Sequence, residues 1–124
     1  MTMGNRFPCP CCGHVVHESV GSSMICPICR WEDDVTQLRW PAYEGGANRT
    51  SLLQAQDNYQ RFGASNPDAA ARARKPRENE PLEPGFRFAD PAIDDFESPD
   101  ETGSPWPSDR SVFYWWRPTF WRRR

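Results

Sequence analysis

The sequence predicts a small α+β domain whose hydrophobic core is too small to be stable without a cross-link, and three observations support this fold class. The chain has 124 residues, enough for one domain, and only 37% of them are hydrophobic. Its 13 Pro and 8 Gly residues leave little room for long helices. All 5 Cys residues lie near the N-terminus, where they can join neighbouring turns.

Several classes of protein are excluded by hydropathy and by the N-terminal sequence. No stretch approaches the roughly 18 consecutive apolar residues that a membrane-spanning helix requires. The N-terminal residues lack the basic stretch and the apolar segment of a signal peptide. We therefore expect a cytoplasmic protein with no membrane span, and we exclude a membrane protein, a secreted protein and a large α/β enzyme.

Four of the Cys residues form two Cys-x-x-Cys turns, Cys9–Cys12 and Cys26–Cys29, which we call the first and second knuckles. An odd number of clustered Cys residues without a secretion signal favours metal binding over disulfides. Two such turns that face each other supply the four thiolates of a tetrahedral Zn²⁺ site. We therefore predict that the metal ligands are Cys9, Cys12, Cys26 and Cys29. Zn²⁺ is the favoured ion and Fe the alternative, because Arg30 follows the second knuckle where rubredoxin-like turns usually have Gly.

The segments around the knuckles predict the rest of a zinc-ribbon or rubredoxin-like domain. Residues 14–17 and 23–25 are expected to form a β-hairpin between the knuckles, with a turn at 19–22. A capping box that begins at Ser51 predicts a helix over about 51–62, packed on the hairpin. Its apolar face would contain Leu52, Ala55, Tyr59 and Phe62. Its polar residues Gln56, Asn58, Gln60 and Arg61 are expected to face solvent.

The remaining residues near the knuckles leave alternatives open. Cys11 is expected to point away from the metal as a buried thiol, and a redox role would need a base and a cleft that the sequence does not show. Trp31 is expected to cover the sulfur atoms, with partner binding as the alternative. The acidic run Glu32, Asp33 and Asp34 fits an acidic contact patch, a helix cap or a solvated surface. A site closed by four thiolates has no open position for a catalytic water, so we expect no enzyme activity.

Three motifs occur together in this order: CPCCG, ICPIC followed by RWEDD, and YEGGANRTSLLQAQDNYQRFGA. Over roughly residues 7–65 the chain resembles the bacterial cysteine-rich CPCC family. The resemblance implies a small Cys-rich, metal-binding, zinc-ribbon-like domain of bacterial intracellular proteins, and it implies no particular activity. By position, the motif residues are Cys9, Cys11, Cys12, Cys26, Cys29, Trp31, Glu32, Asp33 and Asp34.

The part of the chain outside this resemblance changes in composition twice. We interpret residues 1–65 as the zinc-ribbon-like domain and 66–109 as a Pro-rich acidic connector with short helices near 66–75 and 91–97. Residues 110–124 form an aromatic, Arg-rich C-terminal arm without acidic residues. The arm is expected to extend from the domain or to fold back as a clasp or edge strand. It could also bind a partner protein, single-stranded nucleic acid or anionic lipid.

We expect a small protein with structural zinc that acts by binding another protein, without catalysis. The candidate contact residues are Trp31, Glu32, Asp33, Asp34, Trp115, Trp116, Trp121, Arg122, Arg123 and Arg124. A toxin-neutralising (immunity-type) accessory protein, a nucleic-acid-binding zinc ribbon and a thiol redox protein using Cys11 are the alternatives. The negative charge of the remaining chain counts against nucleic acid.

Overall fold

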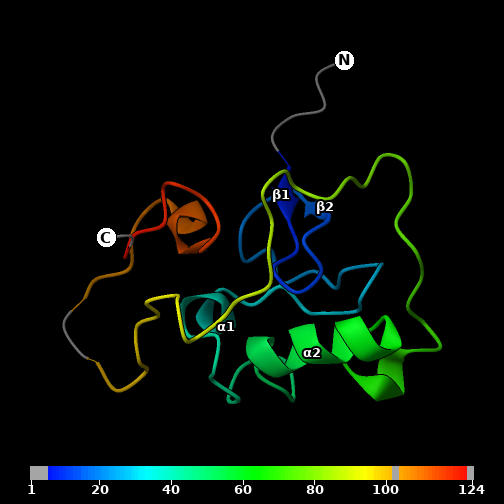
Figure 1. Ribbon diagram of the computed structural model, residues 1–124, viewed down its shortest axis with the longest axis horizontal. Coiled ribbons are helices and arrows are strands. Elements are labelled where there is room, and N and C mark those ends of the chain that lie inside the picture. Colours follow the sequence, from blue (N-terminus) through cyan, green and yellow to red (C-terminus); the bar gives the residue numbers. More distant parts are fainter. Residues whose placement is uncertain (1–5, 102–103, 123–124) are drawn as a thin grey trace.

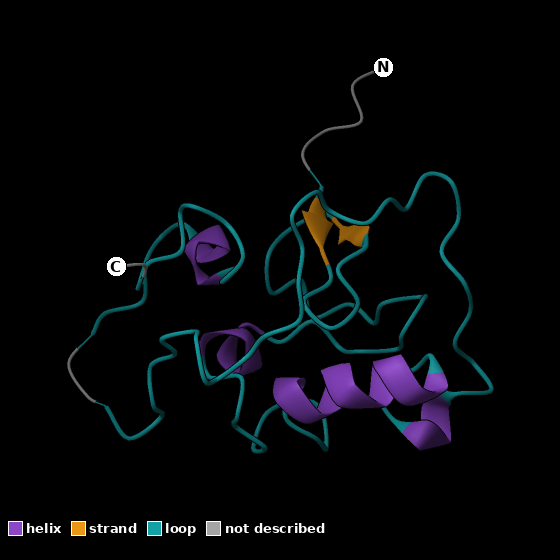
Figure 2. Ribbon diagram, viewed as in Figure 1, coloured by secondary structure: helices purple, strands orange, loops and turns teal. Residues whose placement is uncertain are grey.

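The computed structural model describes residues 6–101 and 104–122. The elements in chain order are β1 (Phe7–Pro8), β2 (Val15–His17), α1 (Val35–Arg39), α2 (Leu52–Phe62) and two 3₁₀ turns, η1 (Pro67–Ala69) and η2 (Arg110–Phe113) (Figure 1). Loops connect these short elements and make up most of the described chain (Figure 2). Within the described ranges, no helix is long and apolar enough to cross a membrane.

The two strands form an antiparallel pair around the first knuckle. In this pair Phe7 lies opposite His17 and Pro8 opposite Val15. A single bridge between Ile25 and Glu32 flanks the second knuckle in the same way. The predicted pairing of residues 14–17 with 23–25 is therefore wrong. Each knuckle instead turns the chain back on itself, so that each pairs its own two flanks.

Helix α2 begins and ends where the sequence predicts. Ser51 Oγ accepts a hydrogen bond from the Gln54 amide, and Gly63 ends the helix with a φ of 75°. The solvent-facing prediction is wrong for Gln56 and Asn58, which are buried. Gln56 donates to the Pro10 carbonyl at 2.8 Å and accepts from the Ala89 amide at 2.9 Å, so α2 joins the first knuckle to the C-terminal half.

Helix α1 was not predicted as an element, although capping was one interpretation of the acidic run before it. The Asp34 side chain caps α1 by accepting from the Thr36 amide at 2.8 Å. Its second oxygen accepts from the Ala47 amide at 2.7 Å. The capping interpretation is therefore confirmed for Asp34, which also fixes the loop that leads to α2.

The helices expected in the connector shorten to turns. Only η1 forms in the first segment, with Asn66 as its cap and Pro67 at its start, as predicted. Around residue 91 the Asp90 carbonyl accepts from the amides of Ile93 and Asp94, which makes a single turn. Both segments are too short to gain the propagation energy of a helix.

The C-terminal arm folds back onto the knuckles and contains no strand among its described residues. Five aromatic residues of the arm share one core cluster with all five cysteines. These aromatic residues are Phe113, Tyr114, Trp115, Trp116 and Phe120. The Tyr114 hydroxyl donates to the Pro8 carbonyl at 3.0 Å, immediately before Cys9. The arm thus supplies core that the N-terminal segment lacks, which agrees with the clasp interpretation and not with an extended arm.

A buried arginine joins α1 to the connector and the arm. Arg39 is 4% exposed and donates to Glu97 at 2.6 Å. Its guanidinium carbon lies 4.6–5.8 Å from the centres of four aromatic rings, those of Trp40, Trp106, Phe113 and Trp121. A buried charge is stable only when it is paired, so this contact needs α1, the connector and the arm to be in place together.

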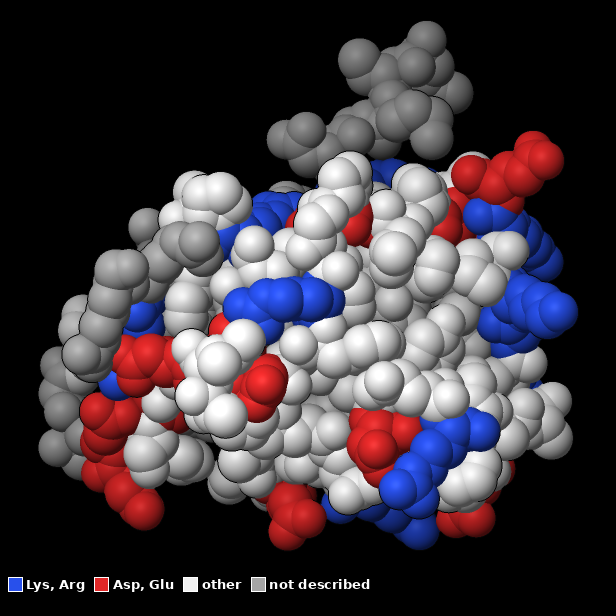
Figure 3. Space-filling view, in the orientation of Figure 1, with Lys and Arg blue, Asp and Glu red and all other residues white. Residues whose placement is uncertain are grey.

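Opposite charges on the connector and the arm neutralise each other. Arg122 lies 3.2 Å from Asp95, and Arg117 pairs with Glu83. Acidic residues still gather at the lower left of Figure 3, over the part of the connector that leads to the arm. The positive charge of the arm is therefore directed at least in part to its own chain.

Candidate metal centre

The first knuckle is a tight turn closed by two backbone hydrogen bonds. The Cys9 amide donates to the His14 carbonyl at 2.8 Å, and the Gly13 amide donates to the Cys9 carbonyl at 2.7 Å. Gly13 adopts a φ of 82°, which glycine takes without steric cost. Pro10 supplies the fixed φ of the turn. This geometry directs the Cys9 and Cys12 side chains to the same side.

The second knuckle repeats the same hydrogen bonds. The Cys26 amide donates to the Trp31 carbonyl at 2.8 Å, and the Arg30 amide donates to the Cys26 carbonyl at 2.9 Å. Arg30 takes the position of the closing glycine with a φ of 71°. Two turns of the same form therefore present Cys26 and Cys29 to the first pair.

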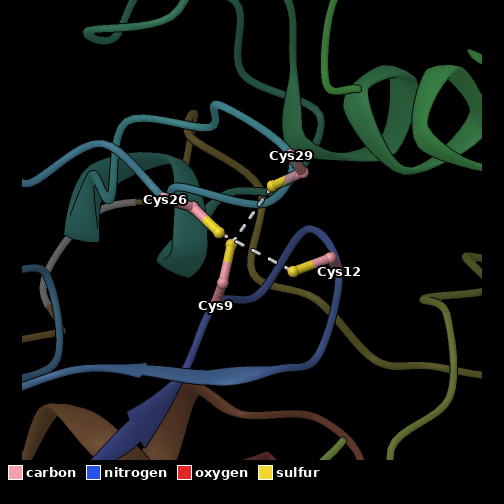
Figure 4. A group of neighbouring side chains, drawn as sticks. All are labelled: Cys9, Cys12, Cys26 and Cys29. Carbon is pink, nitrogen blue, oxygen red and sulfur yellow. Dashed lines mark hydrogen bonds between the residues drawn. The ribbon is translucent and has the colours of Figure 1, made fainter. Parts of the chain in front are cut away.

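The four sulfur atoms of the knuckles meet in the core. All lie within 4.8 Å of one another, and all four residues are buried. The sulfur of Cys9 is 3.6 Å from that of Cys29, and the sulfur of Cys12 is 3.8 Å from that of Cys26. Figure 4 shows the four side chains converging on one point from both knuckles.

The spacing of the sulfurs and their chemistry fit a tetrahedral metal ion. A zinc–sulfur bond of about 2.3 Å places neighbouring sulfurs about 3.8 Å apart in a regular tetrahedron. The separations of 3.6 and 3.8 Å agree with that value. Thiolates are soft ligands that suit Zn²⁺ and Fe and disfavour Mg²⁺ or Ca²⁺. The site therefore fits a thiophilic ion, and its four ligands would close it.

The electrostatics of the cluster show why such an ion would be stabilising. Burial raises the pKa of the Cys9 and Cys29 thiols well above the usual value. Hydrogen bonding between Cys12 and Cys26 raises the pKa of the Cys12 thiol and lowers that of Cys26. The buried site thus resists several negative charges at once. A divalent cation would offset those charges, so metal binding and folding are expected to be coupled.

The sequence that contains both knuckles also matches a known family. The sequence model described as "Cysteine-rich CPCC" matches residues 7–80, more than half of the chain. The chain belongs to the cysteine-rich CPCC family. The match extends beyond residue 65, where the motif resemblance stopped, and it leaves the C-terminal arm outside. No curated protein sequence matches the chain.

In this CPCC protein, α2 and the segment after it support the knuckles. The Ser65 amide donates to the Cys29 carbonyl at 2.7 Å, next to the end of α2. Burial, and secondarily the neighbouring cysteines, raise the pKa of the Tyr59 hydroxyl on α2. Tyr59 is therefore a neighbour of the sulfur cluster, and it lies on the helix face that the sequence predicts to pack inward.

The fifth cysteine of the CPCC motif lies in the same core but outside the set of four. Cys11 is a free thiol with 0% exposure. The expectation of a buried thiol is confirmed. A buried thiol has no access to a substrate, so its surroundings do not favour a redox role.

Several candidate contact residues are not at the surface of the protein. Trp31 and Trp115 are 0% and 1% exposed, and Asp33 and Trp116 are also buried. Their prediction as contact residues is therefore wrong, because these four side chains are buried in the fold. The aromatic side chains fill the core that a domain with few apolar residues would otherwise lack. Trp31 shares the core cluster with the cysteines, in agreement with its expected packing role.

Asp33 organises the loop between the knuckles. It accepts from the Ser22 amide at 2.9 Å and lies 4.0 Å from Nε2 of His17. Burial raises the pKa of the Asp33 carboxyl. His17 in turn contacts Ser22, with 3.0 Å between Nδ1 and Oγ. Asp33 is thus held inside the loop by this polar cluster.

The other candidate contact residues are only partly accessible. Glu32, Asp34, Trp121 and Arg122 are half-buried. Trp121 contacts Arg39, and Arg122 contacts Asp95, so both serve the fold. Arg123 and Arg124 lie outside the described residues.

Two residues that connect the knuckles to the rest of the chain, Gln56 and Glu80, were not predicted from the sequence. Gln56 follows Leu52 by four positions, so helical spacing alone would have placed it on the inner face of α2. Glu80 accepts from Nδ1 of His14 through its carbonyl at 2.8 Å. Its carboxylate binds Arg74, whose amide donates to the Ile28 carbonyl at 3.1 Å. No local pattern indicates this link, because its partners lie far apart in the sequence.

Proposed function

We propose that this CPCC protein is a cytoplasmic, zinc-stabilised protein-interaction module without catalytic activity. The observation that carries the metal-stabilised, non-catalytic part of this proposal is the cluster of four buried cysteine sulfurs within 4.8 Å of one another. Four thiolates complete the shell of a tetrahedral ion, so the metal would stabilise the fold and offer no position to a substrate. The free cysteines suit a reducing compartment.

Exposed apolar side chains beside the second knuckle support protein binding. Met24 and Ile25 are 66% and 47% exposed, although they directly precede a ligand cysteine. They line a hollow of about 560 Å³ together with Val16 and Pro27. The metal centre would hold this part of the chain rigid, and a rigid apolar surface loses little entropy when it binds a partner.

The structural role of the metal can be tested by elemental analysis and chelation. We expect about one zinc ion per chain in protein purified without chelators. Removing the ion should abolish the near-ultraviolet circular dichroism of the buried tryptophans, because the knuckles lose their cross-link. A metal content far below one per chain, or a core unchanged after complete chelation, would contradict the proposal.

Protein binding can be tested with matched surface variants. We expect Met24→Ser and Ile25→Ser to weaken retention of a stoichiometric partner from the native cell extract, while metal content stays normal. Phe62→Ser is the control, because Phe62 is also apolar and 49% exposed but lies on α2, away from this hollow. Equal retention by all three variants would contradict this contact surface, and retention of nucleic acid alone would favour the nucleic-acid alternative.

A further inference from the structure

A polar hollow of about 420 Å³ lies beside the second knuckle, outside the metal centre. It is formed by Arg30 of the knuckle, by residues 47–50 before α2 and by residues after α2. Its remaining lining residues are Ser65, Asn66, Asp68, Ala69 and Arg72. All of them lie within the part of the chain that matches the family model. The hollow is therefore built on the same elements that hold the second pair of cysteines.

The hollow gathers arginines that form no ion pair within residues 6–101 and 104–122. Arg30, Arg49 and Arg72 line it, and none of them forms an ion pair with the described residues of the protein. Six other arginines do pair with carboxylates, and they are Arg39, Arg61, Arg74, Arg87, Arg117 and Arg122. Asp68 is the one acidic residue in the lining, so positive charge remains in excess. Like charges in one hollow repel one another unless an anion lies between them.

Arg30 stands at a backbone position that disfavours it. Its φ of 71° is the left-handed conformation, which costs a residue with a side chain about 1–2 kcal/mol relative to glycine. The first knuckle has Gly13 at the corresponding position. A residue that is unfavourable for the fold but adds charge to a hollow is typical of a functional site.

We propose that this hollow binds a small phosphate monoester through Arg30, Arg49 and Arg72. A phosphate monoester carries about −1.5 to −2 charges at pH 7, and guanidinium groups bind its oxygens with charge-assisted hydrogen bonds. The volume of about 420 Å³ lies in the range of small-ligand sites, so it accommodates the phosphate together with part of the group it esterifies. This activity goes beyond protein binding and does not depend on it.

The experiment is calorimetric titration of the full-length, metal-loaded protein with three probes at low salt. The probes are adenosine monophosphate, inorganic phosphate and adenosine. We expect adenosine monophosphate to bind, inorganic phosphate to compete with it, and adenosine not to bind. Arg49→Gln and Arg72→Gln should each raise the dissociation constant about tenfold or more, because each removes a charge-assisted hydrogen bond. Arg30→Gly should weaken binding similarly while leaving the melting temperature unchanged or higher.

Arg61→Gln is the matched control, because Arg61 is an exposed arginine that pairs with Asp57 on α2. It should leave the dissociation constant unchanged. Equal binding of adenosine and adenosine monophosphate, absence of binding, or equal effects of Arg61→Gln and Arg49→Gln would overturn the proposal. Affinity that appears only with single-stranded oligonucleotides and grows with their length would also overturn it, in favour of a nucleic-acid surface. None of these outcomes bears on metal content, so the two proposals fail separately.

Discussion

The two knuckles share one backbone geometry but differ in what packs over them. Each is closed by the same two amide-to-carbonyl hydrogen bonds, and each ends in a residue with positive φ. The first is covered by the C-terminal half, since the Glu83 amide donates to the Gly13 carbonyl at 2.9 Å. The second leaves the Arg30 side chain at the edge of a polar hollow.

The residue that ends each knuckle faces two separate constraints: its backbone conformation and the space available for a side chain. At position 13 there is no room for a side chain, because a Cβ atom there would lie 2.4 Å from the ring of Phe86. At position 30 the backbone conformation favours glycine, but the side chain has space. The same turn therefore requires glycine in one knuckle and accepts arginine in the other, and the packing of distant residues decides which.

The largest expected effect comes from removing one metal ligand. Cys26→Ser leaves three thiolates, so the second knuckle is no longer pinned to the first, and we expect metal loss and unfolding of both. Elemental analysis and circular dichroism would measure these effects. Cys11→Ala is the control, since Cys11 lies in the same core but outside the cluster of four. Retained metal and an unchanged spectrum in Cys26→Ser would contradict the tetrathiolate site.

The packing of the C-terminal arm over the first knuckle can be tested by a substitution in the arm. Trp115 is 1% exposed and packs on Phe86, with ring centres 6.2 Å apart, and Phe86 lies on Gly13. Trp115→Ala should lower the free energy of unfolding by about 3–5 kcal/mol through the cavity it creates. Urea denaturation of the metal-loaded protein would measure the loss. Phe62→Ala, at an exposed aromatic position, should cost far less, and equal losses would contradict the clasp.

The steric demand at position 13 can be separated from the conformational one. Gly13→Ala should lower the free energy of unfolding by about 2–4 kcal/mol, because it combines left-handed strain with a clash against Phe86. Gly63→Ala is the matched control, with a φ of 75° and open space around the added Cβ. It should show the strain alone, about 1–2 kcal/mol. Equal losses of unfolding free energy in the two variants would show that the clash with Phe86 adds nothing to the cost at position 13.

The ion pair between Glu80 and Arg74, which links the two knuckles, predicts that the free energy of unfolding depends on pH. The hydrogen bonds and charge of Arg74 lower the pKa of the Glu80 carboxyl to about 2, below its value in an unfolded chain. Its stabilising effect is present above the unfolded pKa of about 4.5 and is lost as the pH falls toward 2. Unfolding measured across this window should show a shallower decline for Glu80→Gln than for the native protein. Parallel curves would contradict the link.

The metal cluster and α2 could be predicted from sequence because their determinants are local. The Cys-x-x-Cys spacing fixes each turn, and Ser51 and Gly63 mark the ends of α2 within a few residues. The predicted strand pairing was wrong. It joined residues 14–17 to 23–25 between the knuckles, whereas each knuckle pairs its own two flanking segments. The burial of Trp115 and the Arg39–Glu97 pair depends on contacts between residues distant in sequence, which no local pattern contains.

The smallest expected effect has the opposite sign and completes the comparison of the knuckles. Arg30→Gly makes the second knuckle end like the first and removes left-handed strain of about 1–2 kcal/mol. Glycine also makes the unfolded chain more flexible, which offsets roughly 0.5–1 kcal/mol of that gain. We therefore expect the free energy of unfolding to rise by up to about 1.5 kcal/mol, as measured by urea denaturation of the metal-loaded protein. Arg49→Gln, which removes a charge from the same hollow without changing the turn, should leave stability nearly unchanged. A clear loss of stability in Arg30→Gly would mean that the Arg30 side chain stabilises the fold. The positive φ of Arg30 would then no longer indicate that the hollow is a functional site.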